Sequence, residues 1–442
     1  MHKLVGFVSL GCAKNRVNTE QMMYLLRQAG YTVSGETVGA DVVVLNTCGF
    51  VDSAKSEAID SILELAELKK SGAIGKLVVT GCLPQRHKDD ILTELPEIDA
   101  LVGTGSFDEI ASVVDALWDS EIDLSKLRRF GDISAAISES DRILSTSKAW
   151  AYLKIAEGCD NRCAYCCIPD IRGSFRSRKM ENILTEAEKL VESGVRELIL
   201  VAQDTTMYGL DIYGERRLTE LLRELGSIEK LRWIRLLYLY PDEINDELID
   251  EISKNVKIVK YLDIPIQHIS DNILRKMNRR GTGDEIRSLL KKLRERIDGV
   301  VLRTSVITGL PGEGDKEFNE LYEFLKAAHI ERTGVFAYSP EEGTPAALMQ
   351  RPDEQIAEQR AEIIYRLGTD ILRNFDKSRI GTTTTVLTEA HYESRSVRAR
   401  SFAEAPDVDG YITVKGDNVK ADLFMDIRIT GIENGELVGE KV

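Results

Sequence analysis

Residues 158–167 read Gly158-Cys159-Asp160-Asn161-Arg162-Cys163-Ala164-Tyr165-Cys166-Cys167 and hold four of the seven cysteines of this 442-residue chain. Cys159, Cys163 and Cys166 have the spacing C-x3-C-x2-C. Three thiolates on one short loop are typical of an iron–sulfur cluster with one iron left open for a substrate or cofactor. Zinc is the alternative, but it prefers four ligands in two separated pairs, and no second pair follows nearby. We therefore expect a cluster on this loop and a structural role for Cys167, one residue beyond the third ligand.

The other three cysteines each follow a strand-like run. These runs end in Ser9-Leu10-Gly11-Cys12, Leu45-Asn46-Thr47-Cys48 and Val79-Thr80-Gly81-Cys82. In open parallel sheets, ligands bind outside the carboxyl ends of the strands, so these thiols are expected to converge. Unrelated core cysteines, the alternative, would lie inside strands at varied depths. The pattern predicts a second iron–sulfur cluster held by Cys12, Cys48 and Cys82, again with an open iron.

Alternating apolar runs and helical stretches predict an α/β chain of three parts. Residues 1–118 read as an N-terminal parallel α/β, Rossmann-like domain, and the polar residues 119–149 read as a linker. Residues 150–375 contain six strand-like runs separated by helical stretches, which predicts an open (βα)6 partial barrel with its chemistry at the carboxyl edge. After a long helix over 353–376, residues 376–442 turn to β-branched, alternating runs and predict a small all-β barrel.

Composition and charge narrow the class of protein and its partners. The chain is 43% hydrophobic and 30% charged with 33 Gly and 10 Pro, which excludes collagen-like, disulfide-scaffold and wholly disordered chains. No apolar run approaches the roughly 18 residues of a membrane span, and no signal peptide is visible, so we expect a cytoplasmic protein without a membrane partner. The net charge of −15 favours a basic protein over nucleic acid as the macromolecular partner.

The cysteine loop resembles the motif of the radical S-adenosylmethionine (SAM) superfamily, including the aromatic Tyr165 before the last cysteine. The order of all six cysteines through three parts resembles the methylthiotransferase family, which has an N-terminal cluster domain, a radical SAM barrel and a C-terminal TRAM domain. Three stretches resemble the members that modify a ribosomal protein: Val201–Gly209, Pro265–His268 and, most specifically, Glu404-Ala405-Pro406-Asp407-Val408-Asp409-Gly410. Cys167 departs from the aliphatic residue usual in the family.

The resemblance implies two 4Fe-4S clusters and SAM as cofactors. Its implied reaction is methylthiolation of the β-carbon of an aspartate in small-subunit ribosomal protein twelve, through methyl transfer to a cluster-bound sulfur and then radical replacement of a C–H bond. It also implies a sulfur donor and a low-potential electron donor of the flavodoxin or ferredoxin type, and we expect a monomer. The alternative on the same scaffold is a tRNA adenosine methylthiotransferase. No side chain is expected to act as an acid or base catalyst, because the β-carbon hydrogen is too weakly acidic.

Further residues are candidates for contacts with SAM or the substrate. The stretch Gly309-Leu310-Pro311-Gly312-Glu313 resembles the part of radical SAM enzymes that lies near the adenine and ribose of SAM, which makes Gly309 and Gly312 candidates. For this stretch a plain turn between a strand and a helix is the alternative. The resemblance also implies that the backbone around Tyr165 lies near the adenine. Gln203 and Asp204 follow a strand at the carboxyl edge. Arg303 and Arg172 are candidates for binding a carboxylate, with an ordinary ion pair as the alternative for each. His268 either serves such a role or makes a core hydrogen bond.

Overall fold

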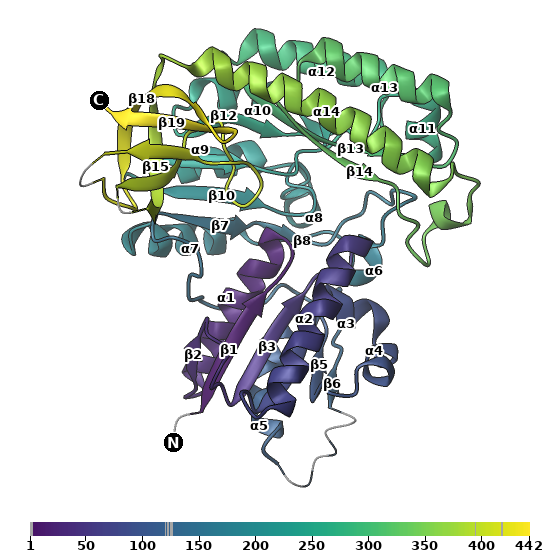
Figure 1. The fold of residues 1–442 in the computed structure, drawn as a ribbon, viewed down its shortest axis with the longest axis vertical. Helices are drawn as coiled ribbons and strands as arrows, with labels where there is room; N and C mark the ends of the chain where they lie inside the picture. The colour runs from purple at the N-terminus through teal and green to yellow at the C-terminus, as the bar shows by residue number, and fades with distance from the viewer. Residues whose placement is uncertain (1–2, 120, 122, 124–126, 394, 417–418) are drawn as a thin grey trace.

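A computed structural model describes residues 3–442 apart from 120, 122, 124–126, 394 and 417–418, and it divides into three parts (Figure 1). In this view the N-terminal domain lies at the bottom, below the middle part of the chain, which forms a partial barrel. The small closed β-barrel of the C-terminal part lies at the upper left, beside the middle part. The predicted fold class is confirmed in all three parts. Residues 120, 122 and 124–126 of the predicted linker lie outside the described residues, and the limits at 118, 149 and 375 remain predictions. No helix in the described ranges is long and apolar enough to cross a membrane.

The N-terminal domain is built on a parallel sheet with the order β2-β1-β3-β4-β5-β6. Its strands are β1 (Leu4–Ser9), β2 (Thr32–Ser34), β3 (Val42–Thr47), β4 (Lys76–Gly81), β5 (Ala100–Val102) and β6 (Arg128–Arg129), and its helices are α1 (Ala13–Gln28), α2 (Asp52–Lys70), α3 (Cys82–His87), α4 (Asp89–Glu94) and α5 (Ile110–Ala116). Strand β3 is buried along its whole length because helices cover both faces, which explains its unbroken apolar run. The short strand β2 was not predicted, and β6 falls within the predicted linker.

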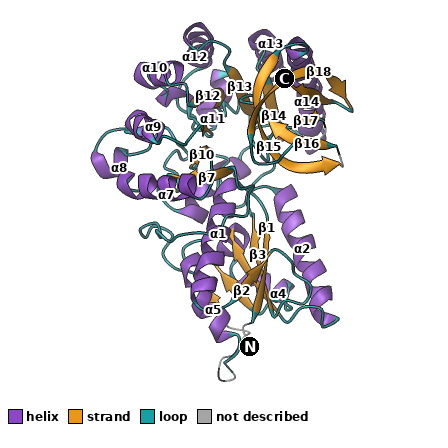
Figure 2. Ribbon diagram, turned by 90° about the vertical axis from the view of Figure 1, so that its left-hand side faces the viewer, coloured by secondary structure: helices purple, strands orange, loops and turns teal. Residues whose placement is uncertain are grey.

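The middle part is a six-stranded parallel sheet in the order β14-β13-β12-β11-β10-β7, open between its two edge strands. Its strands are β7 (Trp150–Lys154), β10 (Glu197–Val201), β11 (Trp233–Leu236), β12 (Ile258–Asp263), β13 (Val301–Thr308) and β14 (Arg332–Ala337), and its longer helices are α7 (Met180–Glu192), α9 (Leu218–Ser227), α10 (Asp246–Lys254), α12 (Gly283–Arg296), α13 (Asp315–Ala328) and α14 (Glu354–Arg379). These helices lie outside the curved sheet (Figure 2). The remaining short elements are α6 (Ile168–Arg172), α8 (Leu210–Tyr213), α11 (Asp271–Lys276) and the hairpin of β8 (Ala156–Glu157) with β9 (Arg176–Ser177). The six predicted barrel strands and the long final helix are confirmed.

The C-terminal part is a closed barrel with the strand order β15-β16-β17-β19-β18. Its strands are β15 (Thr383–Glu393), β16 (Ser396–Arg400), β17 (Ile412–Lys415), β18 (Phe424–Glu433) and β19 (Glu436–Lys441). It packs at the amino ends of the middle strands, where Trp233, the first residue of β11, meets Phe424 edge to face at 4.6 Å between ring centroids. The small all-β barrel predicted from the alternating runs is confirmed.

The connection between β16 and β17 enters the middle barrel from the same end. We call residues 401–409 the inserted segment. Arg235 and Arg332 donate to backbone carbonyls of this segment, and the Tyr261 hydroxyl lies 2.7 Å from the Asp409 carboxylate. The inner apolar core accordingly combines barrel residues with Ala403 and Ala405. Residues 404–410, the stretch that most specifically resembles the members modifying a ribosomal protein, therefore lie at the end of the partial barrel where its strands begin.

Candidate functional site

The three N-terminal cysteines lie at the carboxyl ends of adjacent strands β1, β3 and β4. Cys12 precedes the first turn of α1, and Cys82 is the first residue of α3. Gly11 permits this approach, since a Cβ added there would lie 3.5 Å from the Cys48 sulfur and closer still to its Cβ, and its φ is +86°. Burial and the neighbouring thiols of Cys82 and Cys12 raise the pKa of Cys48 to about 11. The three thiols thus lie close enough to act on one another's charge, and their role as cluster ligands stays a prediction.

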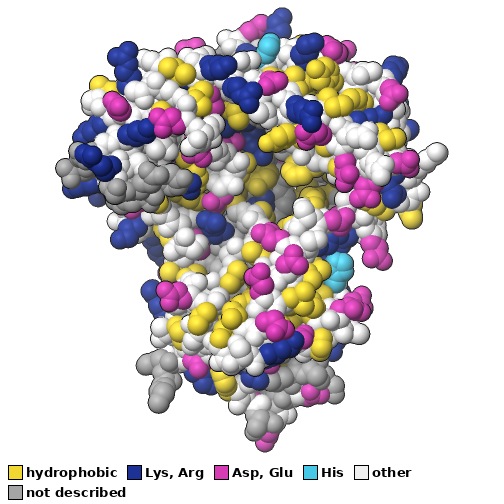
Figure 3. All heavy atoms as spheres, viewed as in Figure 1, with side chains coloured by type: hydrophobic (Ala, Val, Ile, Leu, Met, Phe, Trp, Pro, Cys, Tyr) yellow, Lys and Arg dark blue, Asp and Glu magenta, His cyan; other side chains and the backbone are white. Residues whose placement is uncertain are grey.

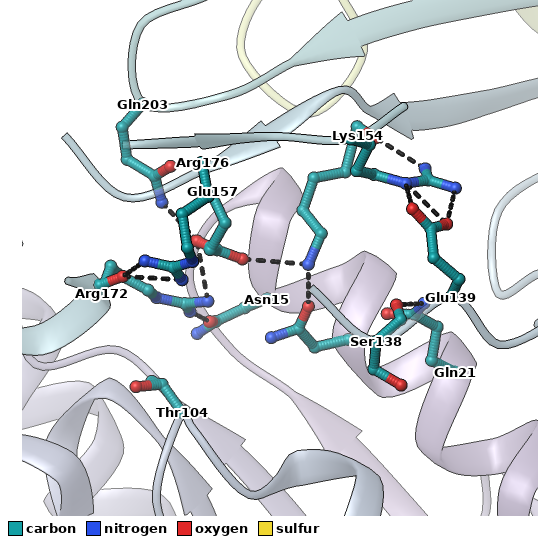
Figure 4. Close-up of polar contacts among 12 residues, drawn as sticks. Asn15, Gln21, Thr104, Ser138, Glu139, Lys154, Glu157, Arg172, Arg176 and Gln203 are labelled. Atoms are coloured by element: carbon teal, nitrogen blue, oxygen red, sulfur yellow. Dashed lines mark hydrogen bonds and ion pairs between the residues drawn. The ribbon is translucent and has the colours of Figure 1, made fainter. Parts of the chain in front are cut away.

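A buried cation, Arg172, lies between Asn15 of the N-terminal domain and Glu157 of the barrel (Figure 4). Arg172, at the end of α6, lies 3.2 Å from the Cys82 sulfur and also contacts the Asn15 side chain. Its other guanidinium nitrogen lies 3.4 Å from Glu157, a buried carboxylate that also accepts from Lys154 at 2.9 Å. Burial alone would raise the pKa of Glu157, but Lys154 and Arg172 hold it well below its usual range. Arg172 thus belongs to a polar network between the two domains. This agrees with the alternative that Arg172 forms an ordinary ion pair within the protein.

The barrel cysteines are held on a loop between β8 and α6. The Ala164 amide donates to the Met277 carbonyl at 2.9 Å, which ties the loop to the end of α11. Burial and the like charges nearby raise the pKa of Cys159 to about 11 and that of Cys166 well above its ordinary value. Clustered thiols that oppose one another's ionisation are stabilised as thiolates by a metal centre. The donor set therefore fits an iron–sulfur cluster.

The spacing of these donors bears on the zinc alternative. Among residues 3–442 as described, no three His, Cys, Asp or Glu side chains are arranged closely enough to hold a single ion. A single zinc ion draws its ligands to about 2.3 Å from one centre, whereas a four-iron cluster is several atoms wide and holds its thiolates further apart. Neither cysteine group, as the structure describes it, therefore forms a single-ion zinc site.

The segment after β11 connects the two cysteine groups. The Tyr240 hydroxyl lies 3.6 Å from the Cys163 sulfur. Two residues earlier, the Tyr238 ring lies 3.5 Å from the ammonium of Lys14, the second residue after Cys12 in α1. A short chain of contacts therefore runs from Lys14, beside the first group, to Cys163 of the second group.

Three family models match successive parts of the chain. The radical SAM superfamily matches residues 153–325, the uncharacterized protein family UPF0004 matches 4–103, and the TRAM domain matches 380–442. Over its full length the chain is 46% identical to the ribosomal protein uS12 methylthiotransferase RimO of Acetivibrio thermocellus, with 99% of that protein covered. The chain belongs to the RimO family of methylthiotransferases. The protein of the same name from Clostridium perfringens is 46% identical over 98% of this chain and 97% of its own length.

Solved structures support the fold of this RimO-family chain. The radical S-adenosylmethionine methyltransferase TsrM from Kitasatospora setae superposes with a TM-score of 0.57 at 14% identity, covering 81% of this chain and 75% of that one. The cobalamin-dependent enzyme OxsB superposes with a TM-score of 0.53 at 13% identity, covering 83% of this chain and 56% of that one. At these identities the likeness concerns architecture alone.

Gln203 and Asp204 lie beside the cysteine loop of the RimO-family barrel. Gln203 donates to Glu157 at 2.7 Å, while its own carbonyl oxygen is buried without a hydrogen-bond partner among the described residues. Asp204 accepts from Asn161 at 2.7 Å, and burial raises its pKa. Asp204 thus fixes the cysteine loop, whereas Gln203 has an acceptor left for a ligand. Their contacts with SAM or substrate stay predictions.

The other candidates are engaged in the barrel itself. Arg303 forms an ion pair with Asp263 at 2.7 Å, as the plain alternative anticipated. Gly309 donates its amide to Glu313 at 3.0 Å, and a Cβ on Gly309 would collide with Ala357 of α14. His268 is fully buried, accepts from the Ser270 amide at 3.0 Å and lies 3.3 Å from Glu313. Gly312 would similarly collide with Lys276 if it carried a side chain. The ligand-contact predictions for this turn remain untested.

Sequence reasoning did not single out Lys14, Asn15, Glu157 and Tyr240 as residues of this region. Lys14 and Asn15 lie two and three residues after Cys12, which follows a strand, and this position was a usable signal. Cys167 packs with Cys82 and Ile171 and lines a pocket of about 470 Å³ together with Arg86.

Proposed function

We propose that this chain methylthiolates the β-carbon of an aspartate in ribosomal protein uS12. The observation that carries the proposal is that two groups of three cysteines, each at the carboxyl edge of a parallel sheet, lie at one domain contact. Arg172 of the barrel reaches Cys82 of the first group, and the segment Tyr238–Tyr240 contacts Lys14 beside Cys12 as well as Cys163 of the second group. A reaction that joins a methylthio group to an unactivated carbon needs both reagents in one place. The full-length relatives named uS12 methylthiotransferase support the same substrate.

We assign Cys12, Cys48 and Cys82 to one 4Fe-4S cluster and Cys159, Cys163 and Cys166 to another. When bound, the clusters and SAM supply the hydrogen-abstracting radical and the methylthio group. The protein holds these groups and shields the reaction from water. The buried network of Arg172, Glu157 and Lys154 holds the barrel and the N-terminal domain in a fixed relative position.

We expect four further features of the working enzyme. It draws on a sulfur donor and on a flavodoxin- or ferredoxin-type electron donor, it acts as a monomer, and it works in the cytoplasm where ribosomal proteins assemble. The C-terminal region 376–442 contains 9 Lys and Arg against 12 Asp and Glu, which suits a basic protein substrate better than RNA.

The substrate is tested by mass spectrometry. Anaerobically reconstituted enzyme is incubated with SAM, sulfide, a low-potential reductant and either uS12 or total tRNA. We expect a mass gain corresponding to SCH3 in place of one hydrogen, localised to an aspartate of uS12. A gain on tRNA alone would favour the tRNA adenosine alternative and refute the proposal.

The ligand assignment is tested by iron and sulfide content. We expect about eight irons in the wild type and about four in Cys48→Ala, because one of two four-iron clusters is lost. Cys167→Ala is the matched control, since it removes a neighbouring thiol outside both triads and should keep about eight irons. An unchanged iron content in Cys48→Ala would contradict the assignment.

A further inference from the structure

Lys14 is a buried cation without a carboxylate partner among the described residues. Lys14 is 6% exposed, and its ammonium lies over the face of the Tyr238 ring, 3.5 Å from the ring centroid. Removing an ammonium from water costs more than an aromatic ring alone returns. Glu157 is the carboxylate whose charge acts on Lys14, but it already accepts from Lys154, Arg172 and Gln203.

Lys154 shows what a satisfied buried lysine looks like in the same region. Lys154 is 1% exposed, and its ammonium donates to Glu157 at 2.9 Å and to the side-chain oxygen Oδ1 of Asn18 at 2.7 Å. Both lysines approach the contact between α1 and the barrel, yet only Lys154 forms an ion pair with a carboxylate there. The ammonium of Lys14 instead faces the Tyr238 ring and the Cys12 thiol, so it has hydrogen-bond donors left for a carboxylate supplied by a ligand.

The position of Lys14 defines where that ligand would lie. Lys14 follows Cys12 by two residues, and the segment that carries its partner Tyr238 also carries Tyr240, 3.6 Å from the Cys163 sulfur. The nearby Asp407 of the inserted segment is paired with Arg16 at 3.3 Å and bonded to the Tyr152 hydroxyl at 2.9 Å. An anion at Lys14 would thus sit between the two cysteine triads.

We propose that Lys14 binds the side-chain carboxylate of the aspartate that is modified. This inference rests on the proposed function. In aspartate the β-carbon is bonded directly to the carboxyl carbon, so anchoring the carboxylate fixes the reacting carbon within one bond length of the anchor. A tRNA base has no carboxylate, so the same lysine would also favour a protein substrate. The carboxylate of SAM offers the same chemistry, and the experiment separates the two sources.

The test is a double-substitution cycle between enzyme and peptide. A labelled peptide spanning the uS12 target, and the same peptide with Asn in place of Asp, are titrated anaerobically against reconstituted enzyme with SAM present. The enzymes are wild type, Lys14→Met, Lys14→Arg and the matched control Lys189→Met, which removes an exposed lysine of α7. We expect wild type, Lys14→Arg and Lys189→Met to prefer the Asp peptide by about tenfold or more, and Lys14→Met to bind both peptides equally.

Each other outcome has a defined meaning. An undiminished preference for the Asp peptide in Lys14→Met would overturn the inference while leaving the proposed function intact. So would a preserved preference with a raised KM for SAM, because Lys14 would then bind the SAM carboxylate. Loss of iron from Lys14→Met would assign the lysine to cluster support and overturn it too. A wild type that neither binds nor modifies the Asp peptide would overturn both the inference and the proposed function.

Discussion

Gly81 occupies a backbone conformation that other residues rarely adopt, immediately before Cys82. Its φ is +101°, and an added Cβ would lie 2.5 Å from the Thr47 carbonyl oxygen and collide with the Asn46 side chain. Gly81→Ala therefore combines backbone strain with overlap against β3, and we expect a loss of about 3 kcal/mol or more in the free energy of unfolding. Because Cys82 is displaced with its neighbour, iron content should fall as well. Thermal unfolding and iron analysis measure both effects.

Gly72 provides the control for Gly81 at the same scale. Its φ is also positive, +77°, but a Cβ there would meet no atom within 4 Å. Gly72→Ala should cost only about 1 kcal/mol, from backbone strain, and leave iron content unchanged. Equal losses in the two variants would show that contact with β3 is unimportant.

At the scale of single elements, the inserted segment is anchored by the buried carboxylate of Glu404. Burial alone would raise its pKa, but Arg379 at 2.6 Å and Arg332 at 2.9 Å lower it to about 2. The folded pKa lies below the unfolded value, so the ionised group stabilises the fold above about pH 4.5, and this stabilisation is lost as pH falls towards 2. We expect its contribution to be on the order of 3 kcal/mol at neutral pH.

Unfolding midpoints between about pH 7 and pH 3 test this contribution. Glu404→Gln should be less stable than wild type at neutral pH and lose less stability on acidification. Glu358→Gln, an exposed position of α14, should follow the wild-type curve. If Glu404→Gln kept the full acid sensitivity of wild type, another carboxylate would have to be responsible.

The same elements show which features the sequence could predict. Strands buried on both faces, such as β3 and β10, stand out as apolar runs, and cysteines at strand ends indicate the sheet edge. The two-residue strands β6, β8 and β9 are too short to give a periodic pattern. The entry of the inserted segment into the barrel depends on buried ion pairs such as Arg332–Glu404, 72 residues apart, which no local pattern encodes. The placement of Cys12, Cys48 and Cys82 at strand ends was predictable from local sequence, whereas the long-range contacts of Lys14 and Arg172 were not.

At the scale of the whole molecule, charge acts on how a substrate approaches. The net charge is −15, and on the face in Figure 3 Lys and Arg side chains are interspersed with Asp and Glu. We expect the overall field to attract a basic ribosomal protein. Such long-range attraction is screened within about 10 Å at 0.1 M salt.

We accordingly expect the association rate of uS12 with the enzyme to fall about tenfold as salt rises from about 50 to about 300 mM, while the dissociation rate changes little. Stopped-flow mixing of labelled uS12 with reconstituted enzyme measures both rates. A short peptide with the target aspartate and few charges is the control, since it should associate at nearly the same rate at both salt concentrations. An association rate of uS12 that ignores salt would contradict steering by net charge, and recognition would then have to arise at short range, beside residues such as Lys14.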